Sequence, residues 1–239
     1  MRSLPRINAR YWLALSAASI FGTNTGDFVA GYLRIGHLAG LPWLLAAFLA
    51  VLLLERVSRV KTPLWFWAAI IIMRTAATNV GDAFHDFRMG FGISVPVSLV
   101  VFVLTVVWYA HVTPPRAAGD DTVQVNGVYW VAMMLAGVLG TVGGDAAARW
   151  LSEPGAAAVF FALAAIAVAT FRRRGILLAA AAYWTVVGLV RTAGTAGGDA
   201  IAHRIGLAPS TVVTGVVFLA LMIFSSRSPA ALSASRPGR

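Results

Sequence analysis

One pattern of four residues recurs four times in this chain at a fixed register, and it constrains the fold more than any other feature. Each copy has a Trp fifteen residues before an Asp, a Thr four residues before that Asp and a Gly directly before it. The Trp and Asp pairs are Trp12 and Asp27, Trp67 and Asp82, Trp130 and Asp145, and Trp184 and Asp199. The threonines are Thr23, Thr78, Thr141 and Thr195. Because the copies align without a gap, the chain is a fourfold internal repeat.

The composition indicates an integral membrane protein. Hydrophobic residues make up 59% of the 239 residues and charged residues only 12%, a balance that is rare in water-soluble domains. We predict eight membrane-spanning stretches, two in each repeat. They begin near Tyr11, Leu38, Leu64, Phe91, Val128, Gly155, Ile176 and Leu207. The stretch 155–171 is short, and its length also suits a buried or re-entrant segment.

Basic residues predict the orientation of the chain. Arg and Lys gather before the first span, between spans two and three, between spans six and seven, and in the C-terminal tail. The positive-inside rule therefore places both termini in the cytoplasm. The formal charge of +10 is explained by these loops, so we expect no nucleic-acid partner.

The repeat also predicts the architecture. Two crossings per repeat start every copy on the same side, which favours an all-α fold of eight transmembrane helices: four parallel two-helix repeats around a pseudo-symmetry axis along the membrane normal. Residues 1–112 would hold repeats one and two, 113–124 a cytoplasmic linker, and 125–225 repeats three and four. Residues 226–239 are expected to form a disordered cytoplasmic tail. The four motif tryptophans are predicted to be interfacial anchors, because amphipathic rings favour that depth.

The aspartates are the strongest candidates for function. An acid at the centre of a span costs about 2.5 to 3.5 kcal/mol on insertion scales, so four copies need a partner or a use. Each motif Thr shares a helix face with its Asp. We expect Asp27, Asp82, Asp145 and Asp199 to act as metal ligands, with the four threonines one turn deeper. The alternative is salt bridging at the interface, for which His85, Arg149 and His203 are same-face partners of Asp82, Asp145 and Asp199.

Two intramembrane arginines complete the candidate site. Arg74 and Arg191 each lie eight residues before a motif Asp, whereas Ser19 and Gly137 hold the equivalent places. Two Arg against four Asp leave a formal charge of −2, which one divalent or two monovalent cations would neutralise. Asn24 and Asn79 follow the motif Thr only in the first half, and we include them among the candidate ligand-binding residues.

With the repeats aligned, the chain resembles a family of bacterial membrane proteins described as four tandem copies of a repeat of unknown function, each with two transmembrane segments and a characteristic Trp. The resemblance extends over residues 11–224. It rests on the four tryptophans and the four Thr-x-x-Gly-Asp ends. It implies an eight-span protein of the bacterial plasma membrane, and it implies no activity.

The leading functional hypothesis is a permease or channel for a hard cation such as Mn²⁺, Mg²⁺, Ca²⁺ or Na⁺. A proton-coupled carrier of a small organic solute, with Arg74 and Arg191 binding an anionic group, is an alternative in the same class. A non-transporting scaffold is the alternative of another class, because a small residue at i and i+4 is also a common device for helix packing.

The remaining expectations concern partners and chemistry. The chain has no Cys, and no Ser, His and Asp set suggests a nucleophile, so we expect no enzymatic activity. We expect no cofactor other than a bound cation. The predicted partners are the lipid bilayer and a small ion or solute, and a homo-oligomer is compatible with the sequence.

Overall fold

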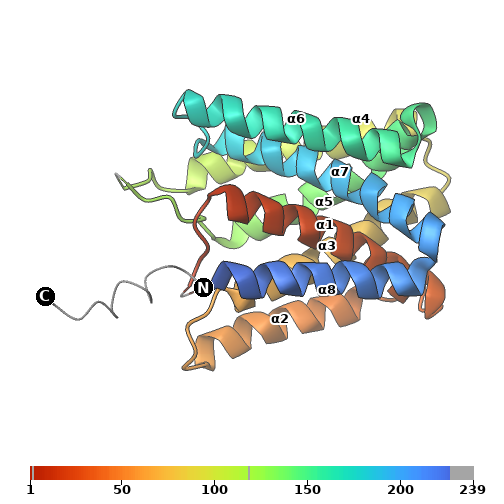
Figure 1. The fold of residues 1–239 in the computed structure, drawn as a ribbon, viewed down its shortest axis with the longest axis horizontal. Coiled ribbons are helices and arrows are strands. Elements are labelled where there is room, and N and C mark those ends of the chain that lie inside the picture. The colour runs from red at the N-terminus through yellow and green to blue at the C-terminus, as the bar shows by residue number, and fades with distance from the viewer. Residues whose placement is uncertain (2, 118, 227–239) are drawn as a thin grey trace, which may run out of the picture.

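The computed structural model describes residues 1, 3–117 and 119–226, and within them the regular structure is helical (Figure 1). Each of the eight α-helices begins within four residues of a predicted span. Residues 227–239 of the predicted tail lie outside the described residues. The helices are α1 (Ala9–Asp27), followed by the π-helix η1 (Phe28–Tyr32), α2 (Leu41–Val57), α3 (Leu64–Asp86), α4 (Phe91–Val112), α5 (Gly127–Leu151), α6 (Glu153–Arg173), α7 (Ala180–Ile205) and α8 (Leu207–Ser226).

Among the described residues, α3, α4, α5 and α6 are long and apolar enough to cross a membrane. The α6 helix has 21 residues, so it is longer than the stretch 155–171 that the sequence indicated. Pro154 at its start is compatible with a helix, because the first turn has no intrahelical use for the missing N–H. The helix content is that expected of a multi-pass membrane protein.

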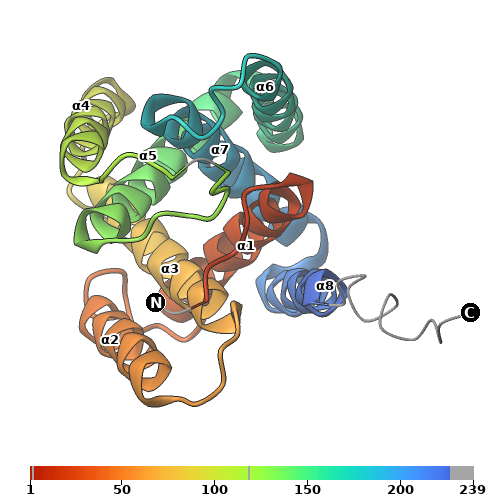
Figure 2. The same cartoon turned by 90° about the vertical axis from the view of Figure 1, so that its left-hand side faces the viewer.

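The helices are arranged as an inner and an outer group. The inner helices α1, α3, α5 and α7 contact one another in sequence, and α7 also contacts α1. The outer helices α2, α4, α6 and α8 lie at the periphery (Figure 2). They pack on α3, α5, α7 and α1 respectively, so each contacts the inner helix of the next repeat.

The outer helices expose large apolar side chains. Trp43 on α2 is 75% exposed, Leu104 on α4 is 64% exposed and Val212 on α8 is 66% exposed. An apolar surface of this extent is unfavourable in water. It is compatible with a lipid environment around the bundle.

Glycines of the motif allow the inner helices to approach closely. A Cβ atom added to the Gly before each Asp would lie 2.7 to 3.3 Å from the Cβ of the motif Thr on the next inner helix. The pairs are Gly26 with Thr78, Gly81 with Thr141, Gly144 with Thr195, and Gly198 with Thr23. Corresponding positions of the four copies therefore meet in a closed cycle, α1 to α3 to α5 to α7 and back to α1.

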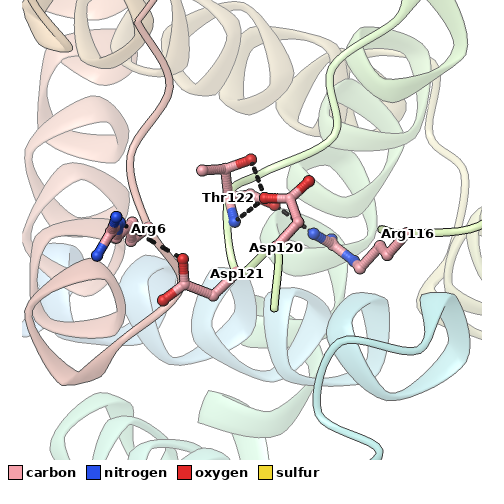
Figure 3. Close-up of polar contacts among 5 residues, drawn as sticks. All are labelled: Arg6, Arg116, Asp120, Asp121 and Thr122. Atoms are coloured by element: carbon pink, nitrogen blue, oxygen red, sulfur yellow. Dashed lines mark hydrogen bonds and ion pairs between the residues drawn. The ribbon is translucent and has the colours of Figure 1, made fainter. Parts of the chain in front are cut away.

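The segment between the two halves is tied to the N-terminus (Figure 3). Arg6 forms an isolated antiparallel bridge with Thr122 and an ion pair with Asp121, with 3.5 Å between Nε and Oδ1. Asp120 accepts hydrogen bonds from the Thr122 hydroxyl at 2.7 Å and the Thr122 amide at 2.9 Å, and these bonds lower the pKa of Asp120. Arg116 donates to the Thr122 carbonyl. This segment lies across the end of the bundle where the inner helices begin.

Two adjacent glycines on α5 test the close approach. Replacing Gly144 with Ala should lower stability by about 1 to 3 kcal/mol, because the new methyl group overpacks the contact with Thr195. The Gly143→Ala control adds a Cβ whose nearest neighbour atoms lie at 3.7 Å. It should leave stability equal or raise it by up to about 1 kcal/mol, since Ala favours helix. Thermal unfolding in detergent measures both, and equal losses for the two variants would contradict the close contact.

Candidate functional site

The four motif aspartates lie near the C-terminal ends of the inner helices and are half-buried. We call this end of the bundle the acidic end. Asp82, Asp145 and the exposed His85 each offer a ligand atom, and these atoms all lie within 4.8 Å of one another. Two carboxylates and an imidazole at this spacing can share one metal ion. The group of three ligand atoms therefore comes from two helices, α3 and α5.

The other two aspartates lie beside this group without belonging to it. The Asp27 carboxyl group is within hydrogen-bonding reach of that of Asp82. Asp199 interacts electrostatically with Asp27, Asp145 and Glu153. The four acids thus lie at one end of the inner bundle, but only Asp82 and Asp145 belong to the group with His85. A further imidazole, that of His37, lies with Nδ1 3.7 Å from the Asp82 carboxylate.

Arg74 occupies the centre of the bundle at the level of the motif threonines. Its guanidinium donates to the hydroxyl groups of Thr23 and Thr195 at 2.6 Å each and of Thr141 at 3.0 Å. It also donates to the carbonyl oxygens of Gly137 at 3.0 Å and Ser19 at 3.4 Å. Three inner helices other than its own therefore supply five neutral oxygen acceptors to one buried cation.

This arrangement engages most of the hydroxyl groups predicted to bind a cation. Three of the four motif threonines accept a hydrogen bond from Arg74, and the fourth, Thr78, donates to the Arg74 carbonyl oxygen at 3.3 Å. A guanidinium is always charged and has no acceptor. At the level of the threonines the centre of the bundle is thus filled by a positive group of the protein itself.

Arg191 lies at the equivalent repeat position but extends the opposite way. Arg74 donates to threonines whose place in the repeat is four positions after that of the arginine. Arg191 donates to the sulfur of Met133, whose place in the repeat is four positions before that of the arginine, at 2.9 Å. Both side chains are buried. The two arginines therefore start at equivalent repeat positions and extend toward opposite ends of the inner bundle.

The two candidate asparagines contact the outer part of the bundle, and Asn24 also lies against Gly198 on the inner helix α7. The Asn24 amide donates to the Thr214 hydroxyl on α8 at 3.5 Å. Asn79 lies against Gly40, just before α2. Both are buried, and neither belongs to the group of Asp82, His85 and Asp145.

The opposite end of the inner bundle, which we call the aromatic end, is closed by eight rings. Each motif Trp contacts the aromatic residue that precedes the Trp of the neighbouring repeat, with ring centroids 5.4 to 6.0 Å apart. The rings are Tyr11, Trp12, Phe66, Trp67, Tyr129, Trp130, Tyr183 and Trp184. The motif tryptophans are buried, so they contact protein on most of their surface. Their role as interfacial anchors stays a prediction.

Four features of the site are not predicted from the sequence. From the sequence, His85 is predicted only as a salt-bridge partner of Asp82, and His37 is predicted to stand alone, because no His pair has metal-ligand spacing. An aromatic residue also precedes the Trp in each copy of the repeat, and this shared position is visible in the sequence. Asn8 and Asn126 stand four residues before Trp12 and Trp130, and each caps its helix by accepting from the Tyr three residues later.

Comparison with known proteins gives one match. The family described as Repeat of Unknown Function (DUF347) matches residues 182–230, a region that contains Trp184, Thr195 and Asp199. The match supports similarity to a repeat family of unknown function over that part of the chain. No curated protein and no solved structure matches the chain.

The same replacement at the two arginine positions tests their different surroundings. Arg74→Lys keeps the charge but offers three donors to five acceptors, so it should lower stability by about 1 to 3 kcal/mol. Arg191→Lys should cost less, because Arg191 has only a weak sulfur acceptor among its protein contacts. Thermal unfolding in detergent measures both. A larger loss of stability for Arg191→Lys than for Arg74→Lys would contradict the difference in hydrogen bonding described for the two arginines.

Proposed function

We propose that this protein is a multi-pass permease of the bacterial plasma membrane that binds a divalent cation at its acidic end. The observation that carries the proposal is the convergence of Asp82, His85 and Asp145 within 4.8 Å. Carboxylate and imidazole groups are metal ligands in proteins, and rings of acids attract cations to pores. The protein acts on no covalent bond in this proposal.

The proposed architecture has eight membrane spans in four parallel repeats around an axis along the membrane normal. The closed cycle of Gly and Thr contacts and the cycle of aromatic contacts support it, because both join equivalent positions of successive copies. Basic connections such as 172–174, between α6 and α7, lie at the aromatic end. By the positive-inside rule that end and both termini are cytoplasmic, so the acidic end faces outward.

The ligand types narrow the choice among the expected ions. Na⁺, Mg²⁺ and Ca²⁺ prefer oxygen ligands, whereas an imidazole suits transition metals. The combination of two carboxylates with His85 favours Mn²⁺ among the four ions considered. Zn²⁺ is the ion to test as its competitor, because it accepts the same ligand types.

Arg74 favours a carrier over an open channel. A fixed positive charge at the centre of the bundle repels a cation that approaches from the acidic end, and the repulsion is strong where water is excluded. A cation can pass along the axis only if the guanidinium leaves its five acceptors. Transport in this proposal therefore requires a conformational change that moves Arg74.

A proton-coupled carrier of an organic solute remains the alternative, and one contact favours it. The carboxyl groups of Asp27 and Asp82 lie within hydrogen-bonding reach, and a hydrogen bond between two carboxyl groups requires a proton on one of them. Flux that depends on pH but not on metal would favour this alternative. The scaffold hypothesis accounts for the glycine contacts and leaves the acids without a role.

Mn²⁺ binding and flux test the proposed site. Asp82→Asn keeps the size of the side chain and removes one charged ligand, so the dissociation constant for Mn²⁺ should rise about tenfold or more. Isothermal titration of purified protein measures binding, and Mn²⁺ uptake into proteoliposomes measures transport. Zn²⁺ should compete in both measurements.

The matched control is Asp86→Asn, which removes an exposed acid four residues away on α3. It lies outside the three-residue group and should bind and transport Mn²⁺ like the wild type. Both variants should unfold at the wild-type temperature, so that a loss of binding reports on the ligand. Wild-type binding and flux in both Asp82→Asn and Asp145→Asn would end the proposal.

A further inference from the structure

Arg191 is a fully buried cation whose donors are largely unused. Its side chain has no exposed surface, and its Nε and Nη1 atoms have no hydrogen-bond partner. Its Nη2 atom donates only to the Met133 sulfur, which is a weak acceptor. A buried polar group without a partner carries a large desolvation cost.

Arg74 provides the comparison within the same molecule. It stands at the equivalent repeat position, is equally buried, and has five oxygen acceptors. A buried arginine in this bundle can therefore have an oxygen acceptor for each of its guanidinium nitrogens. The unused donors of Arg191 call for a specific explanation.

Three tyrosines lie on the side toward which Arg191 extends, and we call Tyr11, Tyr129 and Tyr183 the tyrosine triad. The Tyr183 hydroxyl lies 2.6 Å from that of Tyr11 and 3.2 Å from that of Tyr129. The triad interacts electrostatically with Arg191. Arg74 interacts instead with Asp27, Asp82 and Asp199. Arg191 therefore has tyrosine hydroxyl groups on the side toward which it extends, whereas Arg74 has acids beyond its own hydrogen-bond acceptors.

We propose that Arg191 and the tyrosine triad bind a small, singly charged oxyanion such as a carboxylate. The guanidinium keeps its proton in proteins, so it is satisfied only by an acceptor, and an anionic oxygen forms the strongest hydrogen bonds to it. The tyrosine hydroxyls can donate to the same anion. A single charge matches the one guanidinium available at this level.

In this proposal the anion enters at the aromatic end. Tyr11 lines a cavity of about 260 Å³ together with Arg6 and Arg10. Tyr183 lines a second cavity of about 170 Å³ together with Arg116. Two triad members thus border cavities that carry basic side chains, which raise the local concentration of anions. The anion reaches Arg191 when the triad separates.

This inference goes beyond the proposed cation site and does not require it. The anion site lies toward the aromatic end, whereas the cation group lies at the acidic end, with the Arg74 guanidinium between them. The two sites have no ligand residue in common. Variants at one site can therefore be used as controls for the other.

Thermal unfolding of the full protein in detergent tests the anion site. Sodium acetate, sodium formate and sodium nitrate are titrated against sodium chloride at matched ionic strength. The oxyanions should raise the unfolding temperature in a saturable way, because a ligand that binds only the folded state stabilises it. Arg191→Met should abolish the shift and, in chloride alone, unfold at or above the wild-type temperature, since it removes an unpaired buried charge.

A second variant covers the case in which Arg191→Met does not fold. Tyr183→Phe keeps the ring and removes the hydroxyl that links the triad, and it should weaken the apparent oxyanion affinity about tenfold. The matched control is Tyr32→Phe, which removes the hydroxyl of an exposed tyrosine on η1, after the C-terminal end of α1. It should respond to oxyanions like the wild type.

Two outcomes would overturn the anion site. The first is a wild-type protein that responds equally to chloride and to all three oxyanions. The second is an oxyanion response that persists unchanged in Arg191→Met or Tyr183→Phe. Asp82→Asn should keep the oxyanion response and Arg191→Met should keep Mn²⁺ binding, so failure of one site is distinguishable from failure of the other.

Discussion

The close approach of the four inner helices is the constraint on which the rest of the structure depends. It requires a Gly where each helix meets the motif Thr of the next, because a single added methyl group would overlap the Thr side chain in three of the four contacts and the Asn24 side chain in the fourth, at Gly198. The approach brings threonines from three helices within reach of one guanidinium. It also draws the aspartates, each directly after its Gly, toward one another. The packing role and the chemical role of the motif are therefore two consequences of one geometry.

The helical fold and the positions of the helices could be predicted from the sequence. Helix positions depend on apolar length and on breaks in the pattern, and both are visible in the sequence. The cycle of contacts joins the Gly and Thr positions of the sequence motif. Features that break the repeat were harder to predict. His85 has Ala30, Ala148 and Ala202 at the equivalent positions, so the common motif does not place it among the ligands.

The directions of the arginines could not be predicted for a different reason. Position in a helix fixes where a side chain starts, and a long flexible side chain can extend toward either end of the axis. The choice depends on acceptors that other helices supply. Similarly, the triad has three hydroxyl groups because repeat two carries Phe66 where the others carry Tyr. The hydrogen bonds of the triad depend on how the rings pack, and the spacing of residues in the sequence does not determine that packing.

Electrostatic repulsion explains why the two equivalent arginines extend in opposite directions. Two guanidinium groups at the level of the threonines would face each other in a region without water, where like charges repel strongly. The threonine hydroxyls and helix carbonyls around Arg74 are already used by one guanidinium. Extension of Arg191 toward the tyrosines separates the charges and leaves Arg74 beside the acids. The acidic end thus holds carboxylates next to one fixed cation, and the aromatic end holds a second cation whose partners are neutral.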